Sequence, residues 1–427
     1  MATGSYSTSR TRRANLDFHL SYDFREKKAE IFSGKKTTSR LLFTHGNPNT
    51  SNHLYAGDNI GFLRSMCEDS SVCGKVKLIY IDPPFATGAK FESAQVGNAY
   101  KDCIQGAEYL ESLRQRLILL RELMSVDGSI YLHLDSNMLF PAKVILDEVF
   151  GPERFINLIT RVKCNPKNQA RRQFGDVCDY LLFYSKSEKF TWNQPVEVWD
   201  KISGEKEYNC VEKGSGRRFK KVPCHLPGVR NGATGTKWRG KMPPPGKHWV
   251  HPPQKLDELD REGRIYWSAN GNPRRKLYLD EAAGKRRSNL WTDFRDTQNQ
   301  NARVTGYPTE KNPNLLLMLI QASSNYGDLV LDAYAGSGTT LAAAGELGRR
   351  WIGIDASPTA ITTSVKRIVL GTPRMGSHVR DTYIQREIDL DTVTPNMSFR
   401  LSVDEEDKAL RTALKKTISD LRKTQKE

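Results

Sequence analysis

A short motif, Asp82-Pro83-Pro84-Phe85, follows the apolar run VKLIYI at residues 76–81. Such a run is typical of a buried strand, and in open α/β sheets ligands bind beyond the carboxyl ends of the strands. The two prolines would hold a carboxylate, a main-chain carbonyl and an aromatic ring in fixed positions at that edge. Two acceptors beside an aromatic plate suit a planar base with an exocyclic amine. The alternative is structural, because two prolines can simply end a strand.

A second chemical motif is the glycine turn DAYAGSGTT at residues 332–340, which follows an apolar strand and opens a helix. Gly336 and Gly338 would let the backbone bend sharply and let a ligand lie against bare main chain. No Lys precedes the Thr pair, so the turn is not a Walker A loop. Asp355 ends the next strand about twenty residues downstream, where an acid can hold ribose hydroxyls. The two features together predict a pocket for a nucleoside without a pyrophosphate.

The segments around both motifs alternate between strand-like and helix-like patterns. Apolar runs that lack strict alternation indicate strands buried on both faces, and the segments between them show helical spacing of leucines. The expected strands are 76–81, 128–135, 179–186, the strand with its glycine turn at 327–340, and 350–357; the expected helices are 108–124, 137–150, 312–324, 341–348 and 359–369. This order predicts an α/β fold whose parallel sheet is covered by helices on both faces.

Composition limits the class of protein. The chain has 427 residues, 27% charged and 38% hydrophobic, which is a globular composition that excludes collagen-like, mucin-like and wholly disordered chains. At about 100–200 residues per domain we expect two or three domains, or one large domain with an insertion. We find no apolar run of about 18 residues, no secretory signal and no metal-ligand cluster. The seven scattered cysteines favour reduced thiols, and we expect a cytoplasmic protein that does not enter a membrane.

The charge of the chain points to a polyanionic partner. The formal net charge is +16, and residues 201–250 hold twelve Lys and Arg but three Asp and Glu. Six of the seven Trp lie in or beside that stretch, which is rich in turns and poor in periodicity. We interpret residues 190–300 as an insertion suited to phosphate contacts and to packing on bases or sugars. For most of these Trp a role in the core of a small domain is the better interpretation.

The two ends of the chain differ from the rest in composition and in residue pattern. Residues 1–39 are polar and basic, and we expect a partly ordered arm there. The tail at 402–427 is predicted to be one charged helix that begins at Ser402 as N-cap, with an apolar stripe able to dock on the body or on a second copy. The stripe consists of Leu410, Leu414, Ile418 and Leu421.

At this point the sequence resembles the S-adenosylmethionine-dependent amino-methyltransferases of DNA that carry a DPPY or DPPF motif. The blocks that carry the resemblance are NHLYAGDNIGFLRSM (52–66), KVKLIYIDPPFATGAKF (75–91), DGSIYLHLD (127–135), YPTEKNPNLLLMLI (307–320), GDLVLDAYAGSGTT (327–340) and RWIGIDAS (350–357). The catalytic block precedes the glycine block, and this order is similar to that of the circularly permuted beta class, which includes type III modification subunits and type II adenine methyltransferases.

The resemblance implies a Rossmann-like class I methyltransferase fold, α/β, circularly permuted, with a mostly parallel seven-stranded sheet and helices on both faces. It also implies a target recognition region in the insertion. The expected division is a basic N-terminal arm at 1–39, a first core part at 40–189, the target recognition insertion at 190–300, a second core part at 301–372, and a C-terminal extension with a charged helix at 373–427.

The resemblance also implies roles for individual residues. In the catalytic motif, Asp82 and the Pro83 carbonyl would accept hydrogen bonds from the amine, Pro84 would keep the motif rigid, and Phe85 would stack on a flipped-out base. Lys311 would reach the methionine carboxylate of the cofactor, and Asp332 would either bind the cofactor or bond the turn. The residues expected to bind the cofactor are Asp58, Lys311, Asp332, Ala335, Gly336, Ser337, Gly338, Thr339 and Asp355. The residues expected to contact nucleic acid are Lys163, Lys167, Arg171, Arg172, Arg217, Arg218, Lys220 and Lys221.

The implied activity is transfer of a methyl group from S-adenosylmethionine to N6 of an adenine in double-stranded DNA, in a restriction-modification or a solitary system of a bacterial or archaeal cell. A restriction endonuclease and a second copy of the chain are candidate partners. Three alternatives stay open: methylation of cytosine N4, a catalytically silent DNA-binding subunit, and methylation of RNA or a small molecule. Asp82 favours adenine, because serine is commoner at that position in the cytosine group.

Overall fold

The computed structural model describes residues 20–84, 90–92, 98–101, 106–166, 172, 174–296, 305–372 and 395–424. The chain divides into two compact units: unit 1 comprises residues 1–194 and 288–427, and unit 2 comprises Pro195–Arg287. Three of the expected site residues, Phe85, Lys167 and Arg171, lie outside the described residues. None of the helices in the described ranges is long and apolar enough to cross a membrane.

Unit 1 is built on a ten-stranded sheet in which most neighbouring strands run parallel. In spatial order its strands are β1 (Ser39–His45), β20 (Phe399–Asp404), β2 (His53–Ala56), β19 (Arg350–Asp355), β18 (Leu329–Asp332), β3 (Val76–Ile81), β6 (Met124–Leu134), β8 (Cys178–Ser185), β7 (Phe155–Val162) and β17 (Leu290–Trp291). The expected α/β fold is confirmed, but the sheet exceeds the predicted seven strands. Strands at or next to the two edges, β1, β20 and β17, lack a long apolar run and account for the difference.

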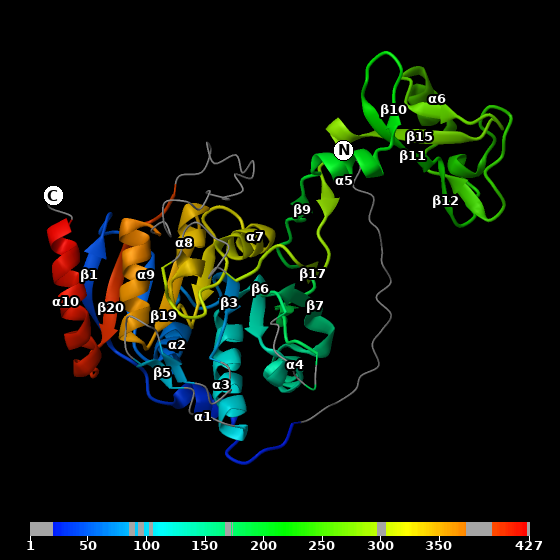
Figure 1. Ribbon diagram of the computed structural model, residues 1–427. Helices are drawn as coiled ribbons and strands as arrows, with labels where there is room; N and C mark the ends of the chain where they lie inside the picture. Colours follow the sequence, from blue (N-terminus) through cyan, green and yellow to red (C-terminus); the bar gives the residue numbers. More distant parts are fainter. Residues whose placement is uncertain are drawn as a thin grey trace. The chain divides into compact units, whose positions relative to one another are not determined.

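Helices cover both faces of this sheet (Figure 1). One face packs against α7 (Pro313–Ser323), α8 (Thr339–Glu346), α9 (Pro358–Leu370) and α10 (Lys408–Thr424). The other face packs against α1 (Lys28–Ser33), α2 (Asn59–Glu68), α3 (Ala107–Leu123) and α4 (Ser136–Phe150). A separate hairpin joins β4 (Lys90–Glu92) to β5 (Asn98–Lys101).

The central strand β3 explains how the two chemical motifs meet. Its side chains alternate between the two cores: Tyr80 faces the side of α7, and Ile79 faces the side of α3. Since both faces are buried, the strand reads as the continuous apolar run found in the sequence. β3 pairs in parallel with β18, with Leu331 opposite Ile79. The DPP motif and the glycine turn therefore leave the sheet at the same edge, although about 250 residues separate them.

The N-terminal segment differs from the expected basic arm, at least from residue 20 onward. The Tyr22 hydroxyl donates to Glu111 on α3 at 2.7 Å, and Arg25 forms an ion pair with Glu148 on α4. Ile31 of α1 is fully buried in the core beneath α3. Residues 20–39 are thus part of unit 1, because a few anchoring contacts outweigh the polar composition that suggested an arm.

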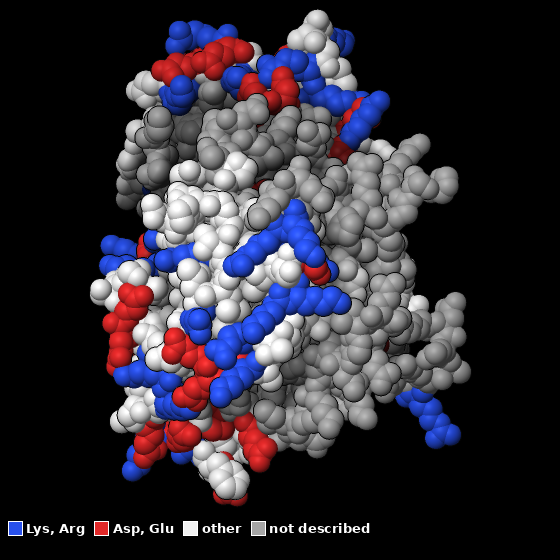
Figure 2. All heavy atoms as spheres, turned by 90° about the vertical axis from the view of Figure 1, so that its left-hand side faces the viewer, with Lys and Arg blue, Asp and Glu red and all other residues white. Residues whose placement is uncertain are grey.

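The C-terminal segment begins its helix later than predicted. Ser402 is not an N-cap but lies inside β20, buried at 4% exposure, and the helix α10 begins after Asp407, whose carboxylate accepts from Leu410 N at 2.8 Å. The apolar stripe of α10 is buried against the body of unit 1, as one of the two predicted options had it. Its outer face is mainly basic, because the helix holds six Lys and Arg but one Asp, and Figure 2 shows this side of the molecule.

Unit 2 is smaller than the predicted insertion. Its elements are β9 (Val196–Glu197), α5 (Lys201–Glu207), β10 (Cys210–Val211), β11 (Arg218–Pro223), β12 (His225–Pro227), β13 (Lys247–Trp249), α6 (Pro253–Arg261), β14 (Ile265–Trp267), β15 (Pro273–Tyr278) and β16 (Lys285–Arg286). Residues 190–194 and 288–296 belong to unit 1, because Asn193 bonds to Ala322 and β17 pairs with β7. The main sheet of unit 2 has the order β10-β11-β15-β14.

Tryptophans form the core of unit 2, as the sequence analysis expected for most of them. Trp238 and Trp249 are each 2% exposed and pack edge to face, with ring centroids 5.8 Å apart. Each indole N–H has an acceptor: Trp238 donates to Asp257 at 2.8 Å and Trp249 to the Thr236 carbonyl at 2.9 Å. Burying the ring while satisfying its one donor is the normal condition for a core tryptophan.

Candidate active site

A cavity of about 230 Å³ opens at the carboxyl ends of β3, β18 and β19. Its lining includes most of the residues that the sequence analysis assigned to chemistry or to the cofactor. These are Asp58, Asp82, Pro83, Pro84, Lys311, Asp332, Ala335, Gly336, Ser337, Thr339 and Asp355. Gly338 lies behind the wall: its φ is +73°, and an added Cβ would come within 2.7 Å of the Ser364 hydroxyl, so its role is to shape the turn.

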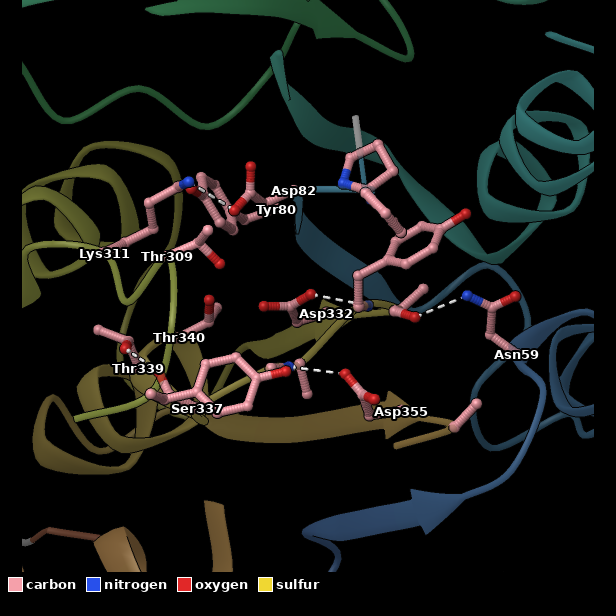
Figure 3. Close-up of a pocket in the computed structure, with 18 of the residues that line it drawn as sticks. Asn59, Tyr80, Asp82, Thr309, Lys311, Asp332, Ser337, Thr339, Thr340 and Asp355 are labelled. Carbon is pink, nitrogen blue, oxygen red and sulfur yellow. Dashed lines mark hydrogen bonds and ion pairs between the residues drawn. The ribbon is translucent and has the colours of Figure 1, made fainter. Parts of the chain in front are cut away.

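At one end of the cavity, Asp82 presents one paired and one unpaired oxygen. Lys311 Nζ lies 2.7 Å from Asp82 Oδ2, and the two side chains are only 11% and 18% exposed (Figure 3). Asp82 Oδ1 is buried and has no hydrogen-bond partner among the described residues. A buried acceptor without a donor is costly, and a ligand is one of the standard explanations for it. Asp82 is therefore arranged to accept a hydrogen bond from something that enters the cavity.

Lys311 reaches Asp82 because the segment that carries it is held on both sides. Glu310 accepts from the Thr305 backbone N–H at 2.8 Å and forms a buried ion pair with Arg367 of α9. On the other side, Asn312 caps α7 by accepting from Asn314 N at 3.0 Å. The observed partner of the Lys311 ammonium is thus the catalytic-motif carboxylate, whereas the sequence analysis expected it to face the methionine carboxylate of a cofactor.

At the other end of the cavity, Asp355 holds the glycine turn. Its Oδ2 accepts from Gly336 N at 2.8 Å (Figure 3), and its Oδ1 accepts from Ser357 N, also at 2.8 Å. Burial raises the pKa of this carboxyl, and these backbone donors oppose the rise. Gly336 has a φ of +51°, and the Arg367 side chain donates to the Ser337 carbonyl at 2.7 Å. The turn is therefore a rigid cradle of main chain with no side chain at Gly336.

Asp332 lies in the cavity wall between these two ends. It is 2% exposed, and burial raises its pKa to about 7, with the charges of Asp82 and Asp355 adding to the rise. Its Oδ1 accepts from Tyr334 N at 3.0 Å, which is the bond within the turn that the sequence analysis gave as one of its two roles. A second carboxylate charge so close to Asp82 is disfavoured near neutral pH.

Ten lining residues were not among the predicted site residues, and the contacts of three of them, Arg116, Asn59 and Tyr80, help to build the site. Arg116 on α3 forms an ion pair with Asp58 Oδ1 at 2.9 Å, and its neighbour Asn59 donates to the Ala333 carbonyl at 2.7 Å. Tyr80, two residues before Asp82, also lines the cavity. Arg116 follows no local motif, whereas Asn59 and Tyr80 stand inside the resembling blocks and could have been found there.

Tyr80 belongs to a buried polar chain that leads away from the cavity. Its hydroxyl lies 2.7 Å from His133 Nδ1 on β6, and His133 Nε2 lies 2.9 Å from Asp179 Oδ2 on β8. Arg161 on β7 reaches the same Asp179 oxygen at 2.7 Å. Burial would raise the pKa of Asp179, but His133 and Arg161 more than offset it and hold the pKa below its usual range. The strand that carries Asp82 is thereby fixed by polar contacts across three neighbouring strands.

Most of the expected nucleic-acid contacts that the structure describes have acidic partners. Lys163 pairs with Asp176 at 3.0 Å, while Arg172 is exposed. In unit 2, three of the four expected cations are paired: Arg217 with Asp280 and Glu281, Arg218 with Glu205, and Lys220 with Glu207. Lys221 instead lies 3.8 Å from the centroid of the Tyr266 ring. In the described ranges no cluster of His, Cys, Asp and Glu could hold a metal ion.

The fold and the cavity define an α/β protein with a carboxylate acceptor and a main-chain cradle at one sheet edge. A family profile described as "DNA methylase", of the N6 and N4 type, matches residues 76–366, which is more than half of the chain. The chain therefore belongs to the family of N6/N4 DNA methylases.

Among curated relatives, the Type II methyltransferase M.EcaI of Enterobacter cloacae is 48% identical over 79% of this chain and 73% of its own length. The Type II methyltransferase M.KpnI of Klebsiella pneumoniae is 27% identical over 70% of this chain and 77% of its own. The Mod subunit of the type III restriction-modification enzyme StyLTI of Salmonella typhimurium is 25% identical over 69% of this chain and 50% of its own.

Solved structures of similar proteins include the cytosine-N4-specific PvuII DNA methyltransferase, with a TM-score of 0.43 and 13% identity over 78% of this chain and 89% of that one. Another is an M1.HpyAVI–SAM complex, with a TM-score of 0.41 and 16% identity over 74% of this chain and 98% of that one. The fold assignment for this protein stands on its own strand order and helix layers.

Proposed function

We propose that this DNA methylase transfers a methyl group from S-adenosylmethionine to N6 of an adenine that is flipped out of double-stranded DNA. The observation that carries the proposal is that one cavity contains both Asp82 Oδ1, which has no partner among the described residues, and the bare main chain at Gly336. The first feature suits an amine, and the second suits a ligand that lies against the turn.

The residues at the Asp82 end would act on the amine. An exocyclic amine is a poor nucleophile because its lone pair is delocalised into the ring. Asp82 Oδ1 would accept one N–H and the Pro83 carbonyl the other, which stabilises positive charge as it develops on nitrogen. The nitrogen would gain the methyl group as the sulfur–methyl bond breaks and the sulfonium becomes a neutral thioether. It would then lose a proton, for which Asp82 is an acceptor at this end of the cavity. Lys311 holds the other oxygen of Asp82 and so fixes the direction of Oδ1.

The residues at the glycine turn would bind the cofactor, which supplies an electrophilic methyl group on sulfonium. The turn from Ala335 to Thr339 offers backbone to the amino-acid part, and an unbranched Gly336 leaves that space open. Asp355, already fixed by two backbone donors, keeps lone pairs for ribose hydroxyls. Asp58, held by Arg116, would lie at the adenine end of the cofactor. Positioning of the two reactants supplies much of the rate.

Two further elements complete the proposal. Unit 2 would choose the DNA sequence, since it carries a large share of the positive charge of the chain. The names of the relatives, which are type II methyltransferases and Mod subunits of type III restriction-modification enzymes, support a restriction-modification setting with a companion endonuclease.

The second candidate is methylation of cytosine N4, which the family also includes. Both amines present two N–H groups to the same acceptors, so the cavity geometry alone favours neither. The aspartate at position 82 favours adenine, because serine is commoner there in the cytosine group.

The test is to incubate the purified protein with S-adenosylmethionine and mixed-sequence duplex DNA, digest the DNA to nucleosides and identify the product by mass spectrometry. N6-methyl-2′-deoxyadenosine is expected. N4-methyl-2′-deoxycytidine would establish the second candidate. No methylated nucleoside on DNA of any sequence would show that the protein is not an active DNA methylase of either kind.

A further inference from the structure

Unit 2 carries much of the positive charge of the chain. It holds twenty-one Lys and Arg against eleven Asp and Glu, a net charge of +10 out of +16 for the whole sequence. All of unit 2 lies within the described residues, so the partners of every charge can be followed. The question is which cations are already neutralised within the unit and which face solvent without a counter-charge.

The acids of unit 2 are almost all used in ion pairs. The only one outside such pairs is Asp200, which caps α5 by accepting from Ser203 N at 3.0 Å. The pairs are Glu197 with Arg287, Glu205 with Arg218, Glu207 with Lys220, Glu212 with Lys276, Asp257 and Asp260 with Arg239, Glu258 with Lys255, Glu262 with Arg264, Asp280 with Arg217, and Glu281 with Arg217 and Arg264. The cations outside these pairs carry the uncompensated charge of the unit.

Both faces of the main sheet of unit 2 carry ion-paired cations. On the face of Lys221 the directly opposite residue is Lys276, which pairs with Glu212. Arg218 and Lys220 alternate with Lys221 along β11, so they point to the opposite face, where they meet the acids of α5. Lys221 points to the other face, with its ammonium 3.8 Å from the centroid of the Tyr266 ring on β14. Lys221 has no carboxylate within ion-pair distance.

Two more unpaired cations lie beside Lys221. Arg274 on β15 is directly opposite both Tyr266 and Pro223, so it shares a face with Lys221. Lys247 on β13 is directly opposite Pro227 on β12, the strand that follows β11 in the chain. Both Lys247 and Arg274 act on His225 of β12: burial lowers the pKa of its imidazole, and these two charges lower it further. Lys247 and Arg274 are exposed, and neither has a carboxylate within ion-pair distance.

We propose that Lys221, Lys247 and Arg274, here called the Lys221 face, are the residues through which unit 2 binds the phosphates of DNA. The inference rests on the proposed function only in taking DNA as the partner. Unpaired cations release counterions from DNA without first breaking an internal ion pair, whereas paired cations must give up a carboxylate. The Tyr266 ring holds the Lys221 stem in place, which lowers the entropy lost when that ammonium meets a phosphate.

The test compares two triple variants that remove the same charge. The first is Lys221→Gln with Lys247→Gln and Arg274→Gln. The matched control, also two lysines and one arginine of unit 2, is Lys220→Gln with Lys255→Gln and Arg218→Gln. These three cations are all ion-paired, and Arg218 and Lys220 point to the opposite face of the sheet. Affinity for a fluorescent duplex is measured by anisotropy between 50 and 200 mM salt, and thermal unfolding with circular dichroism verifies that each variant is folded.

The first variant is expected to lose at least about tenfold in affinity at 50 mM salt. The slope of log affinity against log salt should become shallower by about 0.9 for each lost contact. The control should keep the wild-type slope. An unchanged slope in the first variant, or an equal change in both, would overturn the proposal. Because binding is measured directly, this outcome is distinct from failure of the proposed function, which would appear as wild-type protein that methylates no DNA.

Discussion

Charged side chains are arranged in opposite ways in the two units. In unit 1, three carboxylates of the cavity are largely buried, and the environment of each differs: Asp82 has a lysine, Asp355 has backbone donors, and Asp332 has a raised pKa. In unit 2, the charges are many and exposed, and the acids are used up in ion pairs. Burial makes single charges strong enough for chemistry, while exposure keeps a large positive excess available to a polyanion.

The largest expected effect tests whether unit 2 can unfold while unit 1 still binds the cofactor. Trp249→Ala removes a ring that is 2% exposed from the small core of unit 2, and such truncations cost about 3–5 kcal/mol. We expect unit 2 to unfold at lower urea while the affinity for S-adenosylmethionine, measured by calorimetry, is unchanged. The matched control is Trp351→Ala, which empties an equally buried site in unit 1 and should impair cofactor binding. Loss of cofactor binding in Trp249→Ala would contradict this separation.

The next effect concerns the chemistry of unit 1. Asp82→Asn keeps the size of the side chain but removes the charge that faces the amine and that pairs with Lys311. Turnover should fall about 10²–10³-fold, the usual effect of deleting one electrostatic stabiliser. Affinity for the cofactor should be retained, because Asp82 lies at the opposite end of the cavity from the glycine turn. Near wild-type turnover in a tritium-transfer assay would refute the assigned role of Asp82.

A smaller effect is expected at the cofactor end. Asp355→Ala removes the acceptors for ribose and frees the Gly336 amide, which should weaken S-adenosylmethionine binding by about 1–3 kcal/mol. Asp328→Ala is the control, since Asp328 also accepts a backbone N–H, from Asn325 at 2.8 Å, but does not line the cavity. Gly336→Val should weaken binding as well, because a branched residue is strained at a φ of +51°. Equal calorimetric affinities in all of these proteins would exclude the proposed pocket.

The smallest effect is a pH dependence of stability at Asp332. Its pKa of about 7 in the folded protein exceeds the unfolded value of about 3.9, so the folded state binds more protons between these values. The contribution of Asp332 to stability is therefore present at low pH and is lost as pH rises toward and through 7. The free energy of unfolding of Asp332→Asn, relative to that of the wild type, should rise by at most about 1.4 kcal/mol per pH unit between pH 5 and 7. A difference in urea unfolding free energy that stays constant with pH would contradict it.

Local patterns predicted the central part of the fold well. The run VKLIYI is β3, Val76–Ile81, and the expected helix at 108–124 is α3, Ala107–Leu123. These segments are strongly apolar on the buried side and bounded by turn residues, so short-range physics decides their structure. The second half of β20 was assigned to a helix, because polar residues interrupt Phe399–Asp404 and its strand pairing comes from residues far away in the sequence.

The candidate site was predictable in its residues but not in its contacts. Asp82, Gly336 and Asp355 stand in motifs, and the cavity contains all three. The pairing of Lys311 with Asp82 joins positions 229 residues apart, and no local pattern encodes it. The same holds for Arg217, whose acidic partners are 63 and 64 residues away, so a count of basic residues could not distinguish paired cations from available ones.

The place of β20 in the sheet has a consequence for synthesis of the protein. β1 ends at His45, and in the described structure its sheet neighbour is β20, which begins at Phe399. A ribosome that adds about 5–20 residues per second needs roughly 20–70 s to travel between them. During that time β1 has no partner and β2 presents an open edge, which other nascent chains can join. The last strand to be made therefore closes a surface left exposed by one of the first.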